Sequence, residues 1–321
     1  MTRFRRISSL KRTLDIVTSV LNEELCINEL FMRISTTLSK HPDFQWRLII
    51  CDNGSTDTSW LLIKELSNKH PNVIGIRMSR TFSLDAAFTC GIDLAEADAL
   101  VIMASDLQDP PEVIDDLLIK FKEGYEQVVV KVIKRDSVPF LRRHLTKLFY
   151  LLANKSTNNL IPRGVSDFRL LSKPAYEGAR GLREKNRFLR GLIAWTGFKT
   201  AVIELERPPR FKGESTFIAI KIGKIINSSI NAILSHTSKP LLLISFLGIT
   251  LSVFSVLSTL FFTIFWFTRG VPFAGFGTLV SLILLGFSFT LMSIGILGQY
   301  IALIYEEVKD RPIYIIAEKT F

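Results

Sequence analysis

Short apolar runs alternate with longer segments of helical periodicity over the first 133 residues of the chain. The runs that predict buried strands are residues 14–21, 46–51, 73–78, 99–103 and 127–133. Apolar positions three or four residues apart predict helices over 25–38, from about 58 onwards, over 82–94 and over 112–119. Residues 22–24 are expected to cap the first of these helices. This alternation is typical of a doubly wound α/β domain with a mainly parallel sheet.

Two long stretches without charge follow Pro240. The first covers residues 241–267, and the second lies within 270–305 with its span best placed near 279–300. Each is long enough to cross a bilayer with some tilt, which disfavours the alternative of two buried helices in a soluble protein. The C-terminal part therefore predicts a transmembrane hairpin, which would make this an integral, multi-pass membrane protein.

Basic side chains lie just outside the two stretches: Lys221, Lys224, Lys239, Lys309, Arg311 and Lys319. The loop between the stretches holds only Arg269, so the positive-inside rule places both termini and the α/β domain in the cytosol. The predicted division is a cytosolic domain over 1–220, a juxtamembrane helix over 221–240, two membrane helices over 241–305 and a cytosolic tail over 306–321.

Residues 137–155 predict an amphipathic helix. Arg142, Arg143 and Lys147 are interleaved there with Phe, Leu and Tyr side chains. Such a helix is expected to lie on an anionic membrane surface. The alternative is a basic helix packed on the soluble domain.

The net charge of +10 predicts anionic partners. No nucleic-acid-binding module is recognisable, so membrane lipids and nucleotide phosphates are the simpler partners, and nucleic acid is not expected. No GxGxxG sequence follows the first strand, which disfavours a dinucleotide site. The three cysteines have no metal-ligand spacing and are expected to be reduced thiols in or near the core.

Two predicted strands end in oxygen-bearing side chains. Asp52 projects from the end of one strand, Gly54 permits a tight turn, and Ser55 and Asp57 are expected to cap the next helix. Residues 105–109 (Ser-Asp-Leu-Gln-Asp) follow another strand and supply hard oxygen ligands suited to Mg²⁺ or Mn²⁺ on a diphosphate. The alternative is a loop with ordinary capping acids. Residues 206–215 form a cationic loop that is either a phosphate-clamping lid or a solvated linker.

An ordered series of motifs resembles the polyprenyl-phosphate glycosyltransferases, a membrane-anchored branch of the inverting family-two glycosyltransferases that includes the dolichyl-phosphate mannose synthases. The matching segments are 22–24 (Asn-Glu-Glu), 52–57, 80–82 with 86, 87 and 91, 106–112, 166–170, 186–191, 207–213 and 298–301. The chain looks most similar to the bacterial subgroup that loads glucose from UDP-glucose onto undecaprenyl phosphate for O-antigen or cell-envelope glycosylation. This resemblance implies a GT-A nucleotide-binding domain and the bacterial inner membrane.

The resemblance also implies roles for individual residues. Nucleotide-binding positions would be Ser19, Asn22, Glu23, Asp52, Gly54, Ser55, Ser105 and Asp106. Asp106 and Gln108 would hold the metal, and Asp167 would act with Asp106 at the reacting centre, either orienting the substrates or serving as base. Positions that would hold the acceptor or the diphosphate are Arg135, Arg142, Arg169, Arg207, Arg210, Lys212 and Ser215.

The chain departs from the family pattern at several positions. Ala104 stands where an aspartate is usual, Asn53 follows Asp52 in place of a second aspartate, and residues 83–85 read Ser-Leu-Asp in place of Gly-Lys-Glu. The loss of one carboxylate should weaken metal binding. Asp109 could compensate for it, or it could serve only as a helix cap.

Three alternatives to a transferase that uses UDP-glucose stay open, because no residue fixes the sugar and because the chain departs from the family pattern. They are a transferase using another nucleotide-sugar, a degenerate homologue that binds lipid or nucleotide without turnover, and a processive synthase. The last is disfavoured because two spans provide too little pore. A homo-oligomer formed through the membrane helices is also expected.

Overall fold

The computed structural model describes residues 11–133, 165–206 and 275–321, together with eight isolated positions between 248 and 268. The chain divides into two compact units. The first comprises residues 1–225 with 312–321, and the second comprises residues 226–311. The predicted helix over 137–155, the juxtamembrane segment over 221–240 and most of the first apolar stretch lie outside the described residues.

The first unit is built on one eight-stranded sheet with the strand order β7-β5-β6-β4-β1-β2-β3-β8. The strands are β1 (Arg12–Val20), β2 (Phe44–Asp52), β3 (Val73–Met78), β4 (Ala99–Ala104), β5 (Gln127–Val132), β6 (Val165–Ser172), β7 (Thr200–Leu205) and β8 (Ile316–Lys319). The pairs β1–β2, β1–β4, β2–β3 and β5–β7 are parallel. The predicted α/β class is confirmed, but the sheet is mixed, because β6 runs antiparallel to β4 and β5, and β8 runs antiparallel to β3.

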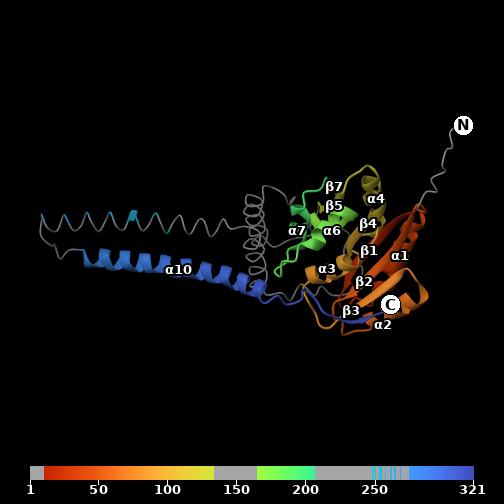
Figure 1. The fold of residues 1–321 in the computed structure, drawn as a ribbon, viewed down its shortest axis with the longest axis horizontal. Coiled ribbons are helices and arrows are strands. Elements are labelled where there is room, and N and C mark those ends of the chain that lie inside the picture. Colours follow the sequence, from red (N-terminus) through yellow and green to blue (C-terminus); the bar gives the residue numbers. More distant parts are fainter. Residues whose placement is uncertain are drawn as a thin grey trace. The chain divides into compact units, whose positions relative to one another are not determined.

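Helices cover both faces of this sheet. The first face carries α1 (Ile27–Ser39), α2 (Ser59–Lys69) and α4 (Ile114–Lys122), and the second carries α3 (Leu84–Leu94), α6 (Lys173–Gly181) and α7 (Leu189–Trp195). Figure 1 shows α1 and α3 on opposite sides of β1 and β2. Successive strand residues alternate between the two cores: Leu48 and Ile50 face one, whereas Ile49 and Cys51 face the other.

The helix starts differ from the prediction in two places. Helix α1 begins at Ile27, and its N-cap Cys26 makes no side-chain cap hydrogen bond, so residues 22–24 do not cap it. A short 3-10 helix, η1 (Pro111–Val113), precedes α4. The cysteines match the expectation, since Cys26, Cys51 and Cys90 are all free and buried.

The second unit contains the long helix α10 (Phe276–Val308), of 33 residues. Judged on the described residues alone, no helix combines the length and apolarity needed to cross a membrane. The transmembrane hairpin thus stays a prediction from the sequence.

A buried ion pair ties the start of β1 to β2. The carboxylate of Asp15 is 2% exposed and accepts hydrogen bonds from Arg47 Nε at 2.8 Å and Nη2 at 2.9 Å. It also accepts the backbone N–H groups of Glu96 (2.8 Å) and Ala97 (3.2 Å). Asp15 therefore fixes the turn between α3 and β4.

Replacing Asp15 with alanine is expected to lower the free energy of unfolding by about 2–3 kcal/mol, because the Arg47 guanidinium, whose side chain is 30% exposed, and two backbone N–H groups lose their buried partner. Chemical unfolding followed by far-UV circular dichroism measures the change. Glu96→Gln is the matched control, since Glu96 is 83% exposed and lies 3.6 Å from the same Arg47. It should change stability by less than about 1 kcal/mol, and equal effects of the two variants would refute the argument.

Candidate active site

The parallel strands β1, β2, β3 and β4 all end at one edge of the sheet, where α/β folds bind ligands. The loops that follow β1 and β2 are locked together there. Asn22 adopts a left-handed conformation with φ 56°. Its side-chain oxygen accepts the N–H of Thr56 at 2.8 Å, and its own N–H donates to Ser55 Oγ at 3.0 Å. The Asn22 side chain thus shapes the loop, which leaves its predicted contact with a base or ribose untested.

Glu23 and Glu24 take part in the same connection. The N–H of Glu23 donates to Ser59 Oγ at 3.1 Å, and the Glu24 carboxylate accepts the N–H of Thr58 at 3.0 Å. Asp57 accepts the N–H of Ser59 at 3.0 Å, as its predicted role in starting α2 requires. Ser55 binds Asn22 instead of capping that helix, so this part of the prediction was wrong.

Asp52, the last residue of β2, is completely buried. Its Oδ1 accepts the N–H of Ser55 at 3.0 Å, but its Oδ2 has no hydrogen-bond partner, and the nearest cation is Arg77, with Nε at 3.4 Å. Burial raises the pKa of Asp52, and the Ser55 and Arg77 contacts oppose that rise. A buried carboxylate oxygen without a donor is costly unless a ligand supplies one. Asp52 is thus suited to accept an N–H or O–H from a bound molecule.

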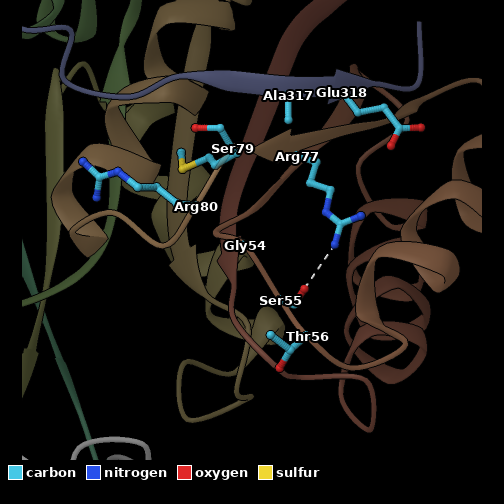
Figure 2. Close-up of a pocket in the computed structure, with 9 residues that line it drawn as sticks. Gly54, Ser55, Thr56, Arg77, Ser79, Arg80, Ala317 and Glu318 are labelled. Atoms are coloured by element: carbon cyan, nitrogen blue, oxygen red, sulfur yellow. Dashed lines mark hydrogen bonds between the residues drawn. The ribbon is translucent and has the colours of Figure 1, made fainter.

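A cavity of about 520 Å³ opens beside this loop. Gly54, Ser55 and Thr56 line it on one side, and residues 77–80 at the end of β3 line it on another. Ala317 and Glu318 of β8 complete the wall, and Figure 2 shows Arg77 reaching from β3 toward Ser55, whose carbonyl accepts its Nη2 at 3.2 Å. The volume is that of an ordinary small-molecule pocket.

Gly54 holds the loop close to β3. It has φ +78°, and a Cβ there would lie 2.8 Å from the carbonyl carbon of Arg80. Both the conformation and the space therefore require glycine.

If this loop binds a nucleotide, as the resemblance implies, Gly54→Ala is expected to weaken that binding roughly tenfold or more, because strain and overpacking together reach about 2 kcal/mol. Calorimetric titration with UDP measures the effect. Gly124→Ala is the matched control, since Gly124 has φ +88° but nothing within 4 Å of its Cβ position. If Gly124→Ala weakened UDP binding as much, the close approach to Arg80 would not be the cause.

The loop after β4 carries the predicted metal ligands. Asp106 Oδ1 accepts the N–H of Gln108 at 3.2 Å, and Leu107 between them has φ 60°. Asp109 is fully buried, and its Oδ2 accepts the N–H of Ala104 at 3.3 Å. Asp109 thus braces the loop from inside, and whether it also replaces the carboxylate missing at position 104 stays open.

The oxygen donors of this loop fit a hard divalent cation that takes further ligands from a diphosphate. No group of three His, Cys, Asp or Glu side chains able to hold a metal alone occurs in the described residues. Asp106 and Gln108 would therefore act together with the substrate's oxygens. Ser105 serves the fold, because its hydroxyl donates to the carbonyl of Ser19 at 2.8 Å and joins the ends of β4 and β1.

Strand β6 brings Asp167 to the same edge. The antiparallel pairing of β4 and β6 reaches Ile102 opposite Arg169, so the two strands continue toward Ala104 and Asp167. The guanidinium of Arg190 donates to both carboxylate oxygens of Asp167 through Nε and Nη2. The register of β4 and β6 thus places Asp167 at the edge of the sheet where the Asp106 loop begins, and the structure adds Arg190 as its partner. A joint role of Asp106 and Asp167 stays a prediction.

Arg169 lies inside the sheet, and its predicted role in holding the acceptor or the diphosphate stays untested. It is 3% exposed and donates to the carbonyls of Ser166 at 2.8 Å and Asp167 at 3.2 Å. Burial lowers the pKa of its guanidinium to about 10, and Asp167 partly offsets this. Arg169 would have to leave this position to reach a phosphate. The other predicted phosphate-binding residues lie outside the described residues: Arg135, Arg142, Arg207, Arg210, Lys212 and Ser215.

Arg77, Arg190 and Glu318 had no predicted role, although Arg190 lies in the matching segment 186–191. Arg77 is a charged residue inside a predicted buried strand, and such a position could have indicated a site residue. Glu318 gives no local signal, because β8 reaches β3 only through a pairing some 240 residues apart in sequence, Arg77 opposite Glu318.

The fold and the acidic side chains at the strand ends define an α/β protein with a ligand site at the carboxyl edge of its sheet. A sequence model of the Glycosyl transferase family 2 matches residues 15–179. YkcC of Bacillus subtilis (strain 168), a glycosyltransferase by name, is 36% identical over 94% of this chain and 92% of its own length. The SfII prophage-derived bactoprenol glucosyl transferase of Shigella flexneri is 33% identical over 94% of this chain and 97% of its own length. The chain belongs to glycosyltransferase family 2.

Among solved structures, glucosyl-3-phosphoglycerate synthase from Mycobacterium tuberculosis in complex with Mn²⁺, UDP-glucose and phosphoglyceric acid superposes with a TM-score of 0.46. The two chains are 18% identical, and the match covers 69% of this chain and 79% of that one.

Proposed function

We propose that this glycosyltransferase moves a sugar, most directly glucose from UDP-glucose, onto a polyprenyl (undecaprenyl) phosphate at the cytosolic membrane face. The product would feed O-antigen or cell-envelope glycosylation. The observation that carries the proposal is the register of β4 and β6, which places Asp167 at the sheet edge where the Asp106 loop begins in a family-two chain. The name of the Shigella relative, matched over nearly the full length of both chains, supports the acceptor and the sugar.

The donor's nucleoside is assigned to the region of Asp52. The Oδ2 of Asp52, which lies 3.4 Å from Arg77 Nε and accepts no hydrogen bond, suits an N–H or O–H of the nucleoside, and the cavity beside residues 54–56 has room for a base and ribose. The diphosphate would then extend toward the end of β4. Asp106 and Gln108 would hold a Mg²⁺ or Mn²⁺ ion, which when bound neutralises charge on the departing diphosphate.

The transfer step exchanges one C–O bond for another. An oxygen of the acceptor phosphate forms a bond to the anomeric carbon, the bond from that carbon to the donor's β-phosphate breaks, and UDP leaves with the electron pair. Attack opposite the leaving group inverts the anomeric centre. Because the acceptor is already anionic, positioning and charge stabilisation lower the barrier more than a strong base does. Asp167, fixed by Arg190, is assigned to orienting the sugar or the acceptor.

Membrane attachment is part of the proposal. The uncharged stretches at 241–267 and 270–305 support a hairpin with the catalytic domain in the cytosol. Along α10, large apolar side chains such as Ile283, Phe287, Ile294 and Ile301 are more than half exposed in this chain. That exposure supports burial in lipid or against another copy. The helix over 137–155 would bring the acceptor's phosphate toward the site from the membrane surface.

One observation favours a second candidate, a lipid- or nucleotide-binding scaffold without turnover. Ala104 supplies no metal ligand, and Asp109 is buried in the loop. Such a protein would bind UDP or polyprenyl phosphate but form no product.

The test is transfer of radiolabelled sugar from a panel of UDP- and GDP-sugars to undecaprenyl phosphate, using the full chain in detergent micelles with Mg²⁺, Mn²⁺ or EDTA. We expect lipid-linked product from one donor, and we expect EDTA to abolish it. If no donor gives product while UDP still binds, the scaffold replaces the transferase. Product from a donor other than UDP-glucose would correct the sugar and leave the reaction class intact.

A further inference from the structure

Strand β8 closes one side of the cavity beside the end of β3. The two strands are antiparallel, with Arg77 directly opposite Glu318. The register then shifts, so that Met78 lies opposite Ile316 and Ala317 is passed over. Ala317 and Glu318 both line the cavity, and Figure 2 shows them on the strand that runs past Arg77. The segment that follows the long helix α10 in the chain therefore contributes to the cavity assigned to the donor's nucleoside.

The carboxylate of Glu318 fixes the indole ring of Trp60. Trp60 lies on α2 and is 3% exposed, and its Nε1–H donates to Glu318 Oε2 at 2.9 Å. The other carboxylate oxygen, Oε1, forms an ion pair with Lys64, whose Nζ also lies 5.5 Å from the centroid of the Trp60 ring. An indole N–H of a buried side chain is costly to leave without an acceptor. The orientation of this ring therefore depends on a residue of β8.

The Trp60 ring in turn contacts Arg77. The guanidinium carbon of Arg77 lies 5.8 Å from the ring centroid, which is within the range of a cation–π interaction. Arg77 Nη2 donates to the Ser55 carbonyl at 3.2 Å, and its Nε lies 3.4 Å from Asp52 Oδ2. A series of contacts thus leads from Glu318 through Trp60 and Arg77 to the loop that lines the cavity.

Other groups hold β8 in place independently of Glu318. The Oγ1 atom of Thr320 accepts the N–H of Gly75 at 2.9 Å, and the Ile315 carbonyl accepts the N–H of Ser79 at 2.9 Å. These bonds lie on both sides of Glu318 along the segment. Removing the Glu318 side chain should therefore leave the strand paired, so its effect on the cavity can be measured in a folded chain.

We propose that Glu318 is a positioning residue for the donor's nucleoside, which acts through Trp60 and Arg77 to set the shape and charge of the cavity. The role in donor binding rests on the proposed function, whereas the series of contacts from β8 to Ser55 does not. Without the carboxylate, the indole ring loses its acceptor, and Arg77 loses the anionic neighbour across the strand pair. The cost should fall on donor binding, because the metal and the acceptor are assigned to the ends of β4 and β6.

The first arm of the test needs no ligand. The full-length chain in detergent micelles is labelled with 5-fluorotryptophan, and Trp60→Phe identifies the fluorine resonance of Trp60 by its loss. Glu318→Ala should shift that resonance by more than its linewidth, and Glu318→Gln should shift it less, because the amide oxygen still accepts the indole N–H. Lys319→Ala is the matched control, since Lys319 is an exposed neighbour on β8 whose Nζ lies over the Phe321 ring. An unchanged resonance in Glu318→Ala, or an equal shift in Lys319→Ala, would overturn the proposal.

The second arm measures UDP binding by calorimetric titration and sugar transfer by initial rates. We expect Glu318→Ala to weaken UDP binding and to raise the donor KM roughly five- to twentyfold, with kcat changed by less than about threefold. In a chain that already carries Trp60→Phe, the same substitution should cost less than about threefold, because the route through the indole is already lost. A full loss in both backgrounds would mean that Glu318 meets the donor directly, and it would refute the positioning route.

Failure of this proposal differs from failure of the proposed function. If the unaltered chain transfers sugar while Glu318→Ala leaves UDP binding and the donor KM unchanged, the role of Glu318 is refuted and the transferase stands. If the unaltered chain binds UDP but transfers no sugar, the transferase fails, and the effect of Glu318→Ala on UDP binding still decides the role of this residue. If the unaltered chain binds no UDP, both fail.

Discussion

Replacing Asp106 with alanine is expected to reduce sugar transfer by at least about 100-fold, the largest loss we anticipate from a single substitution. Ala104 stands two residues before Asp106, and Asp109 is fully buried. In the described part of this loop, Asp106 and Gln108 are therefore the partly exposed side chains that offer oxygen atoms to a cation. Removing the Asp106 carboxylate would leave the charge of the departing diphosphate largely uncompensated. The Asp106→Ala substitution should therefore lower kcat more than it weakens the binding of UDP.

Two further variants isolate the cause of that loss. Asp106→Asn keeps a side-chain oxygen that can accept the Gln108 N–H, which Asp106 Oδ1 now accepts at 3.2 Å, and it removes only the charge. Asp116→Asn removes an exposed carboxylate from α4 and serves as control for net charge. Initial rates at saturating donor, over a series of Mn²⁺ concentrations, distinguish the outcomes. Full activity in Asp106→Asn would contradict a charge-dependent role.

The five strands that the sequence predicted all exist, because each is a local run of apolar residues bounded by turn signals. Strands β6, β7 and β8 were not predicted, and each depends on partners far away in the chain. Residues 316–319 alternate buried and exposed positions only weakly, and their place beside β3 depends on long-range bonds such as Gly75 N–H to Thr320 Oγ1 at 2.9 Å. The local periodicity of apolar residues does not indicate which distant segments pair with one another.

In the candidate site too, some residues could be predicted from local sequence and others depend on long-range contacts. Asp52 and Asp106 were recognisable from their position after apolar runs, whereas Asp167 was named through the resemblance to the family. Their partners were not predicted, because Arg77 and Arg190 reach them through pairing and packing that the sequence does not display. Asn22 belongs to a matching motif, but its expected local role was wrong, because its side chain accepts the Thr56 N–H and does not cap α1.

The structure of the loop shows what the backbone of Ala104 does. Its N–H donates to the buried Asp109 at 3.3 Å, so the backbone at this position helps to close the loop whatever side chain it carries. A carboxylate is therefore dispensable for the loop's shape, and its absence bears on the chemistry alone. We therefore expect the missing carboxylate at position 104 to change the metal dependence of transfer and to leave the fold unchanged.

The second large effect is expected at Asp167. Asp167→Asn should lower kcat about 100-fold or more with the donor KM changed less than about threefold, because the amide cannot accept both N–H groups of Arg190 and no longer presents a fixed negative charge to the reactants. Rapid-quench measurement of a single turnover separates this step from product release. A fall in donor affinity alone would instead place Asp167 in nucleotide binding.

Arg190→Lys tests the same carboxylate from the other side, since lysine keeps the charge but loses the planar fork that donates to both Asp167 oxygens. If Arg190 acts only by fixing Asp167, the double variant Asp167→Asn with Arg190→Lys should be no slower than Asp167→Asn by itself. Fully additive losses would mean that Arg190 contacts the substrate directly. We expect the losses to be strongly non-additive, because the structure gives Arg190 its two strongest contacts at Asp167 and its third at a backbone carbonyl of the same strand.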